Sequence, residues 1–268
     1  MSALFGVDFS SAPRPAKPIA VAHGHVDGGV VHLERLAALP DWPGFEALLH
    51  TPGPWLGAFD FPFGLPREGI AALGWPATGW AALVRHVATL DKTTFRAALD
   101  ADRQRRPMGA RYPHRRTDHA ARSHSPMKLV NPPVGLMFFE GAPRLLAADC
   151  TLPGLHAGDP ARLAVEAYPG QLARRITAAS YKSDTPAKQT AARRAARHAI
   201  VAALSAGVAG LPLALTPSQH AQLVDDPRGD WLDAVLALMQ AAGCAQQGAP
   251  RFGAPCDADP LEGWIATV

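Results

Sequence analysis

The sequence contains few cysteines, and the three that it has show no C-x-x-C spacing. This pattern argues against a disulfide framework or a zinc ribbon and is typical of a reducing compartment. The N-terminus has no basic region ahead of an apolar stretch, so we expect no signal peptide. The longest uncharged apolar stretch, residues 200–215, is interrupted by Gly and Pro and is too short to span a bilayer. The sequence therefore predicts a soluble, cytoplasmic protein with no membrane segment.

Several common catalytic motifs are also missing. There is no G-x-x-x-x-G-K-[ST] loop and no G-x-G-x-x-G, which disfavours P-loop and Rossmann nucleotide chemistry. The absence of G-x-S-x-G disfavours an α/β-hydrolase. The eleven histidines include no H-E-x-x-H and no zinc-like spacing. Acidic side chains remain as the main candidates for chemistry.

Charge is unevenly distributed along the 268 residues, whose net charge is only +3. Residues 103–128 carry eight Lys or Arg against one acid, and residues 174–197 carry seven against one. Such basic segments predict contact with a polyanion such as DNA or RNA, although two solvated charged faces would give the same pattern. The candidate phosphate-binding residues are Ser10, Arg111, Arg115, Arg116, Lys128, Lys182 and Lys188.

The first 61 residues show the pattern of a small mixed sheet. Apolar runs separated by turn signals, including Asp27-Gly28-Gly29, predict a three-stranded antiparallel meander. A short helix capped by Asp41 then leads to a fourth strand, which we expect to be parallel to its neighbour. The expected strands cover residues 3–9, 19–25, 30–36 and 55–61, and the helix covers residues 40–50.

The rest of the chain is more irregular, and we interpret residues 62–160 as a helical and basic insertion within a single domain of residues 1–268. Pro169-Gly170 is expected to stop a fifth strand, and Gly243 to end a closing helix. Inside the insertion, helices are expected over 70–99 and 133–149. After it we expect a strand at 162–168, helices at 185–206 and 229–243, a loop at 244–260 and an edge strand at 263–268.

Acidic residues stand where the predicted strands end. Asp8 and Asp60 close the first and fourth strands, and Glu166 closes the fifth. The carboxyl ends of strands in open α/β sheets carry the chemistry of such folds. Asp230 and Asp233 open the last helix, where Asp230 could also act as a simple cap. Converging carboxylates of this kind predict Mg²⁺ or Mn²⁺ at Asp8, Asp60, Asp230 and Asp233, with Asp8, Asp60, Glu166 and Asp233 as catalytic residues.

Five short segments of the chain carry a resemblance to a known family. The segments are Phe5-Gly6-Val7-Asp8, Phe59 to Pro66, Val165 to Pro169, Asp230 to Ala234 and Glu262 to Ile265. They resemble the family known as domain of unknown function 429. The resemblance implies a ribonuclease H-like fold and a predicted nuclease activity. In that fold the acids come from the first strand, the fourth strand and the last helix, and Asp8, Asp60 and Asp233 or Asp230 match this pattern.

Three functional hypotheses follow. The first is a Mg²⁺- or Mn²⁺-dependent nuclease that hydrolyses phosphodiester bonds in nucleic acid. The second is a phosphotransferase or ATPase of the actin-like fold, in which the turn after Asp8 holds phosphate. The third is a non-catalytic nucleic-acid-binding module that retains the acidic cleft.

Overall fold

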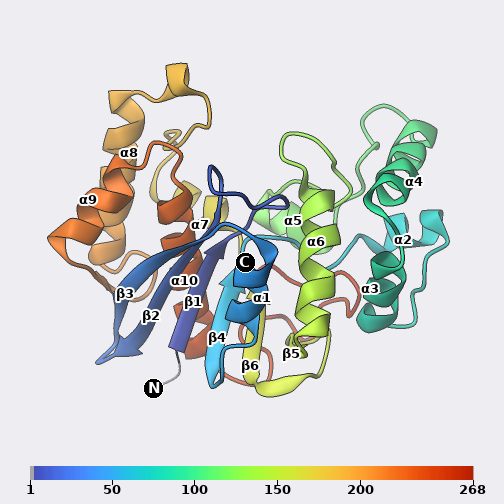
Figure 1. The fold of residues 1–268 in the computed structure, drawn as a ribbon, viewed down its shortest axis with the longest axis horizontal. Helices are drawn as coiled ribbons and strands as arrows, with labels where there is room; N and C mark the ends of the chain where they lie inside the picture. The colour runs from blue at the N-terminus through green and yellow to red at the C-terminus, as the bar shows by residue number, and fades with distance from the viewer. Residues whose placement is uncertain (1–2, 268) are drawn as a thin grey trace.

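The computed structural model describes residues 3–267, which form an α/β fold around one mixed sheet (Figure 1). The sheet order is β5-β6-β4-β1-β2-β3-β7. β1 to β3 form the expected antiparallel meander, and β4 and β6 run parallel to β1, which confirms the mixed topology. The strands are β1 (Ala3–Asp8), β2 (Ile19–Asp27), β3 (Val30–Leu39), β4 (Trp55–Phe59), β5 (Cys150–Thr151), β6 (Asp159–Glu166) and β7 (Leu213–Ala214).

Helices cover both faces of the sheet. One apolar core lies between the sheet and α7 to α10, and a second lies between the sheet and α1, α3, α4 and α6. The helices are α1 (Trp42–Leu49), α2 (Arg67–Leu73), α3 (Trp80–Ala88), α4 (Lys92–Arg105), α5 (Arg116–Ala121), α6 (Val134–Ala147), α7 (Pro169–Ile176), α8 (Ala191–Ser205), α9 (Pro217–Asp225) and α10 (Asp230–Gln247).

β1 and α10 approach each other closely, backbone to backbone. α10 presents Ala234 to the sheet, and a Cβ placed on Gly6 of β1 would lie 2.1 Å from the carbonyl oxygen of Ala234. The same Cβ would lie 2.1 Å from the amide nitrogen of Leu238. Only glycine permits this backbone contact, which brings the first turn of α10 to the end of β1.

We expect Gly6→Ala to lower the free energy of unfolding by about 2–4 kcal/mol, because two backbone segments must separate to admit the methyl group. Urea denaturation measures the change. Gly79→Ala is the matched control, since a Cβ at Gly79 meets nothing within 4 Å and the residue precedes α3 in extended backbone. Equal stability of the two variants would contradict the proposed close contact.

Residues 62–160, which we interpret from the sequence as a helical insertion, contain several short helices. The helical pattern predicted over 70–99 is divided among α2, α3 and α4. Gly74 ends α2 in the left-handed conformation, and the side chain of Asp91 caps the start of α4 by accepting from Thr94 N. These local caps outweigh the continuous apolar periodicity of the segment.

Later elements also differ from the prediction. Pro169 begins α7 instead of only ending a strand, because proline is well tolerated in the first helical turn. α10 continues through Gly243 to Gln247, so the predicted end at Gly243 is wrong. The edge strand expected at 263–268 is reduced to a single bridge from Ile265 to Glu166, and residue 268 lies outside the described residues. β5, β7 and α9 were not predicted.

The buried hydrophobic residues of the chain pack into these two cores. Within residues 3–267, none of the helices combines the length and the apolar character that a membrane crossing needs.

Candidate functional site

Parallel pairing places three acids at consecutive strand ends. Val7 of β1 pairs with Phe59 of β4, so Asp8 and Asp60 leave the sheet side by side. The amide of Asp60 donates to the carbonyl of Val7 at 2.9 Å, which fixes the two chain ends together. Phe59 in turn pairs with Glu166 of β6. The strand-end acids predicted from the sequence therefore do share one edge of the sheet.

The first turn of α10 completes the acidic group. Gly229, with a φ of 74°, turns the chain into the helix, and Asp230 and Asp233 follow in the first turn. The Asp233 side chain is fully buried and accepts hydrogen bonds from two groups of one loop. The Tyr181 hydroxyl donates to Oδ1 at 2.5 Å, and Lys182 Nζ donates to Oδ2.

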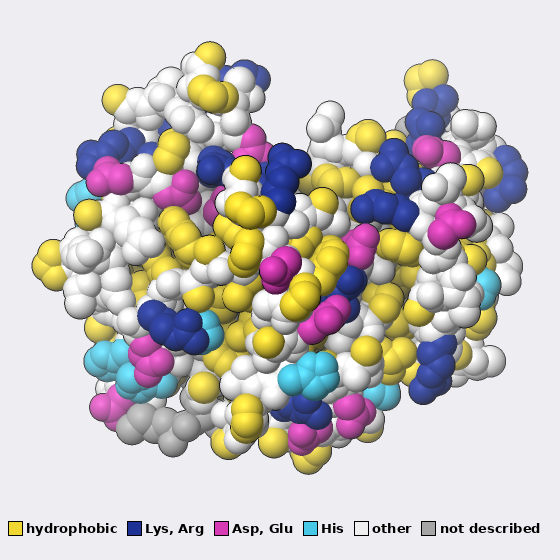
Figure 2. Space-filling model, in the orientation of Figure 1, with side chains coloured by type: hydrophobic (Ala, Val, Ile, Leu, Met, Phe, Trp, Pro, Cys, Tyr) yellow, Lys and Arg dark blue, Asp and Glu magenta, His cyan; other side chains and the backbone are white. Residues whose placement is uncertain are grey.

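Apart from the buried Asp233, these residues open onto a cleft of about 870 Å³. The hollow lies between α7 and the loop of residues 177–184 on one side, and the segments that flank α5 and the start of α6 on the other (Figures 1 and 2). Asp8, Asp60 and Asp230 form part of its wall together with Lys182. A cleft of this size accommodates a ligand much larger than a single ion. Basic residues that also line it are Arg14, Lys17, Arg174 and Arg228.

The carboxylates of Asp8 and Asp60 repel other acids of the cleft. Burial, and then the negative charge of Asp233, raise the pKa of Asp60 to about 7. Burial and the same neighbour raise the pKa of Asp8 well above its usual range. Within residues 3–267 neither carboxylate accepts a hydrogen bond that would offset this cost. Burial and repulsion therefore disfavour the ionised form of both side chains, and a cation bound between them would stabilise that form.

Lys182 provides a positive charge inside this group. Burial disfavours its charged form, but attraction by Asp233, Tyr181 and Asp8 outweighs burial and raises the pKa of Lys182 well above its usual range. Its ammonium is therefore protonated across the physiological pH range. The same charge lowers the pKa values of Asp8 and Asp60, although not enough to overcome their burial.

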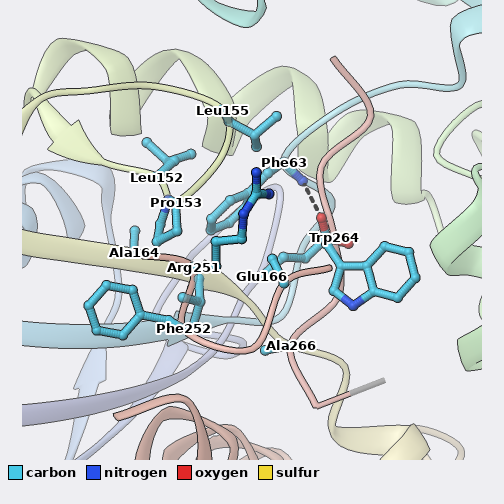
Figure 3. Close-up of a pocket in the computed structure, with 12 residues that line it drawn as sticks. Phe63, Leu152, Pro153, Leu155, Ala164, Glu166, Arg251, Phe252, Trp264 and Ala266 are labelled. Atoms are coloured by element: carbon cyan, nitrogen blue, oxygen red, sulfur yellow. Dashed lines mark hydrogen bonds between the residues drawn. The ribbon is translucent and has the colours of Figure 1, made fainter. Parts of the chain in front are cut away.

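Glu166 has a different environment from the other strand-end acids. Its Oε1 accepts from Nη2 of Arg115 at 2.6 Å, and its Oε2 accepts from Nη1 at 2.8 Å. Oε2 also accepts from Phe63 N at 2.9 Å, as the dashed line in Figure 3 marks. Burial, opposed by Arg115, raises the pKa of Glu166. The carboxylate has both oxygens engaged, so its contacts tie α5 to the sheet.

Glu166 also borders a second, much smaller cavity of about 20 Å³ (Figure 3). Apolar side chains such as Phe63, Leu152 and Phe252 surround it, with the Trp264 ring at its edge. Such a volume holds about one water molecule. It is too small for a substrate, so the large cleft is the candidate site.

Comparison with protein families decides the affiliation of the chain. A family model described as a protein of unknown function, DUF429, matches residues 6–257, a range that includes the whole acidic group. The chain belongs to the DUF429 family. No curated protein and no solved structure is found to be similar to it.

Of the residues predicted in this DUF429 chain to bind phosphate, only some reach the cleft. Ser10, Arg115 and Lys182 line it, whereas Arg111, Arg116, Lys128 and Lys188 do not. Much of the basic segment 103–128 is paired with acids, either within α4 and its C-terminal end or in other elements. Those pairs are Arg103–Asp100, Arg105–Asp102, Arg106–Asp102, Arg106–Glu68, Arg115–Glu166 and Arg116–Asp257.

Four further basic residues that line the cleft were not predicted from the sequence. Arg14 and Lys17 lie on the loop directly after Asp8, where the backbone of the two residues forms a small bridge. Arg174 lies in α7, and Arg228 precedes α10 and donates to Ala16 O at 2.6 Å. Their proximity in sequence to Asp8, Glu166 and Asp230 was a usable signal, because residues following strand ends and preceding helices share the same edge.

The donor set of the DUF429 cleft suits a hard divalent cation held by few protein ligands. No group of three or more His, Cys, Asp or Glu side chains within residues 3–267 is arranged to hold a metal ion. Asp233 is engaged by Tyr181 and Lys182, which leaves Asp8 and Asp60 as the free adjacent carboxylates. Mg²⁺ commonly binds through one or two carboxylates and keeps several waters, so these two residues fit it.

Proposed function

We propose that this DUF429 protein is a divalent-metal-dependent nuclease that hydrolyses phosphodiester bonds in DNA or RNA. The proposal rests on one observation about Asp8 and Asp60. These two carboxylates lie in a large cleft at the ends of neighbouring parallel strands, and neither accepts a hydrogen bond within residues 3–267. A cation bound there would offset the burial and the charge of Asp233 that raise the pKa values of both carboxyls.

The topology supports a ribonuclease H-like assignment. An antiparallel meander is followed by parallel strands, and a C-terminal helix packs on the first strand. The sequence resemblance implies acids on the first strand, the fourth strand and the last helix, and Asp8, Asp60 and Asp230 or Asp233 occupy those elements. Family membership gives no reaction by itself, since the function of DUF429 is unknown.

In this proposal Asp8 and Asp60 hold Mg²⁺ or Mn²⁺, with Asp230 on the adjacent wall of the cleft. A bound divalent ion of this type activates water and stabilises charge on phosphate oxygens. Arg14, Lys17 and other cations of the rim attract and orient the phosphate backbone. Glu166 contributes by holding Arg115 and the cleft wall, since its own oxygens are occupied.

A panel of single-stranded, duplex and structured DNA and RNA substrates with Mg²⁺ or Mn²⁺ tests the proposal. We expect cleavage of at least one substrate class, abolished by EDTA and by Asp8→Asn, which removes a carboxylate charge while keeping the side-chain size. Salt-sensitive binding without cleavage under either metal would instead identify a nucleic-acid-binding module. Thermal stabilisation by ATP alone would favour an actin-like phosphotransferase.

A further inference from the structure

Lys182 occupies an unusual place for a surface-loop lysine. It follows α7, and its ammonium reaches the carboxylate of Asp233, which is buried and does not itself line the cleft. The Asp233 side chain has no exposed surface, whereas the Lys182 side chain is 44% exposed. The lysine side chain therefore extends from solvent into the acidic group, where its ammonium contacts the fully buried carboxylate of Asp233.

The surrounding contacts fix this position. Tyr181 donates its hydroxyl to the other oxygen of Asp233, and its carbonyl accepts from Nη1 of buried Arg197 at 2.7 Å. Nε of Arg197 also donates to Val224 O at 2.7 Å, which anchors the guanidinium to α9. At Gly229 a Cβ would lie 2.8 Å from the Cβ of Lys182, so the loop packs closely against the start of α10. Lys182 is held from several sides.

Lys182 is the cation that acts on both Asp8 and Asp60. Asp8 is affected by the charges of Asp233, Lys182, Asp230 and Asp60, and Asp60 by those of Asp233 and Lys182. A divalent ion at Asp8 and Asp60 would leave Asp233 unneutralised without another cation. Lys182 supplies that cation and takes up one oxygen of Asp233, while Tyr181 takes up the other.

We propose that Lys182 is a built-in cation that occupies the place of a second divalent ion, so that the cleft binds one metal ion at Asp8 and Asp60. The presence of an ion at Asp8 and Asp60 rests on the proposed function. The exclusion of a second ion at Asp233 is inferred separately, from the contact of Lys182 with that carboxylate. A one-ion site of this kind differs from a two-ion site, in which two metals clamp the attacking and leaving oxygens.

Titration with Mn²⁺ tests this, with the free ion followed by electron paramagnetic resonance. We expect one Mn²⁺ per wild-type chain and one additional Mn²⁺ per chain for Lys182→Met, because Asp233 then becomes available. The double variant Lys182→Met, Asp233→Asn should return to the wild-type number. Lys188→Met, which removes an exposed lysine outside the cleft, should bind as the wild type does.

Thermal unfolding confirms that each variant is folded before titration, and Lys182→Gln replaces Lys182→Met if the latter does not fold. An unchanged Mn²⁺ number in both Lys182 variants would overturn the proposal. A third outcome separates the two proposals: the wild type binds no Mn²⁺, but the Lys182 variant binds one ion that Asp233→Asn removes. The proposed role of Lys182 would then be supported, and the proposed metal-dependent nuclease activity would be contradicted. If neither binds, both fail.

Discussion

Asp60→Asn is expected to reduce metal-dependent cleavage by at least about 10³-fold while making the protein more stable at pH 8. Asp60 is one of two free carboxylates at the strand ends, so its loss removes a ligand of the proposed ion. The same carboxylate is destabilising in the metal-free protein, because burial and Asp233 raise its pKa to about 7. We expect a gain of about 1–3 kcal/mol in the free energy of unfolding at pH 8.

The pH dependence of stability follows from the same shift. In the unfolded chain Asp60 ionises near its ordinary pKa of 3.8, whereas in the folded protein it holds its proton up to about pH 7. The folded state therefore binds more protons between these values, and its stability decreases as the pH rises through that window. Asp8 acts in the same direction, since its pKa is also raised. In Asp60→Asn the decrease should be smaller.

Urea denaturation at pH 5 and pH 8 in EDTA measures this, alongside cleavage assays in Mg²⁺. Asp257→Asn is the control, because Asp257 lies at the surface outside the cleft and pairs with Arg116. Its cleavage rate should equal that of the wild type. A stability loss in Asp60→Asn at pH 8 would contradict the electrostatic argument, and an unchanged cleavage rate would contradict the metal site.

Arg115→Met is expected to lower the free energy of unfolding by about 3–5 kcal/mol, since it leaves buried carboxylates without their counter-ion. The Arg115 side chain is 2% exposed and pairs with both Asp118 and Glu166. Asp118 belongs to the same short helix, α5, whereas Glu166 ends β6. The variant should therefore detach α5 from the sheet as well as leave two buried acids unpaired.

The neighbouring Arg116→Met provides a matched control, because Arg116 and its partner Asp257 are both exposed. Its urea midpoint should stay close to that of the wild type. Adding Glu166→Gln to Arg115→Met removes one of the orphaned charges and should recover part of the loss. Equal midpoints for Arg115→Met and Arg116→Met would show that the buried network does not stabilise the fold.

The strand-end acids could be predicted because their signal is local. A short apolar run before Asp8 and another before Asp60 each predict a buried strand, and the two strands proved to be parallel neighbours. The turn signal at Gly28-Gly29 likewise predicted the meander. In the structure both glycines adopt positive φ between β2 and β3. Features of this kind depend on a few consecutive residues, which the sequence presents directly.

The partners of the charged residues could not be predicted, because they are distant in sequence. Arg115 meets Glu166 across 51 positions, and Lys182 meets Asp233 across the same separation. The net charge of the basic segment predicted to bind phosphate was therefore calculated without the distant acids that pair with it. Asp257, which pairs with Arg116, is one of them. The charge of a segment indicates a polyanion surface only when its partners are known.

The contact of Gly6 with α10 has a consequence for synthesis on the ribosome. β1 is the first strand to emerge, but the helix that covers it and carries Asp230 and Asp233 is the last. A nascent chain that has not reached α10 has neither the completed cleft nor a covered sheet face at Leu4. Translation that stops early thus releases a product with exposed apolar surface, which chaperones and proteases recognise.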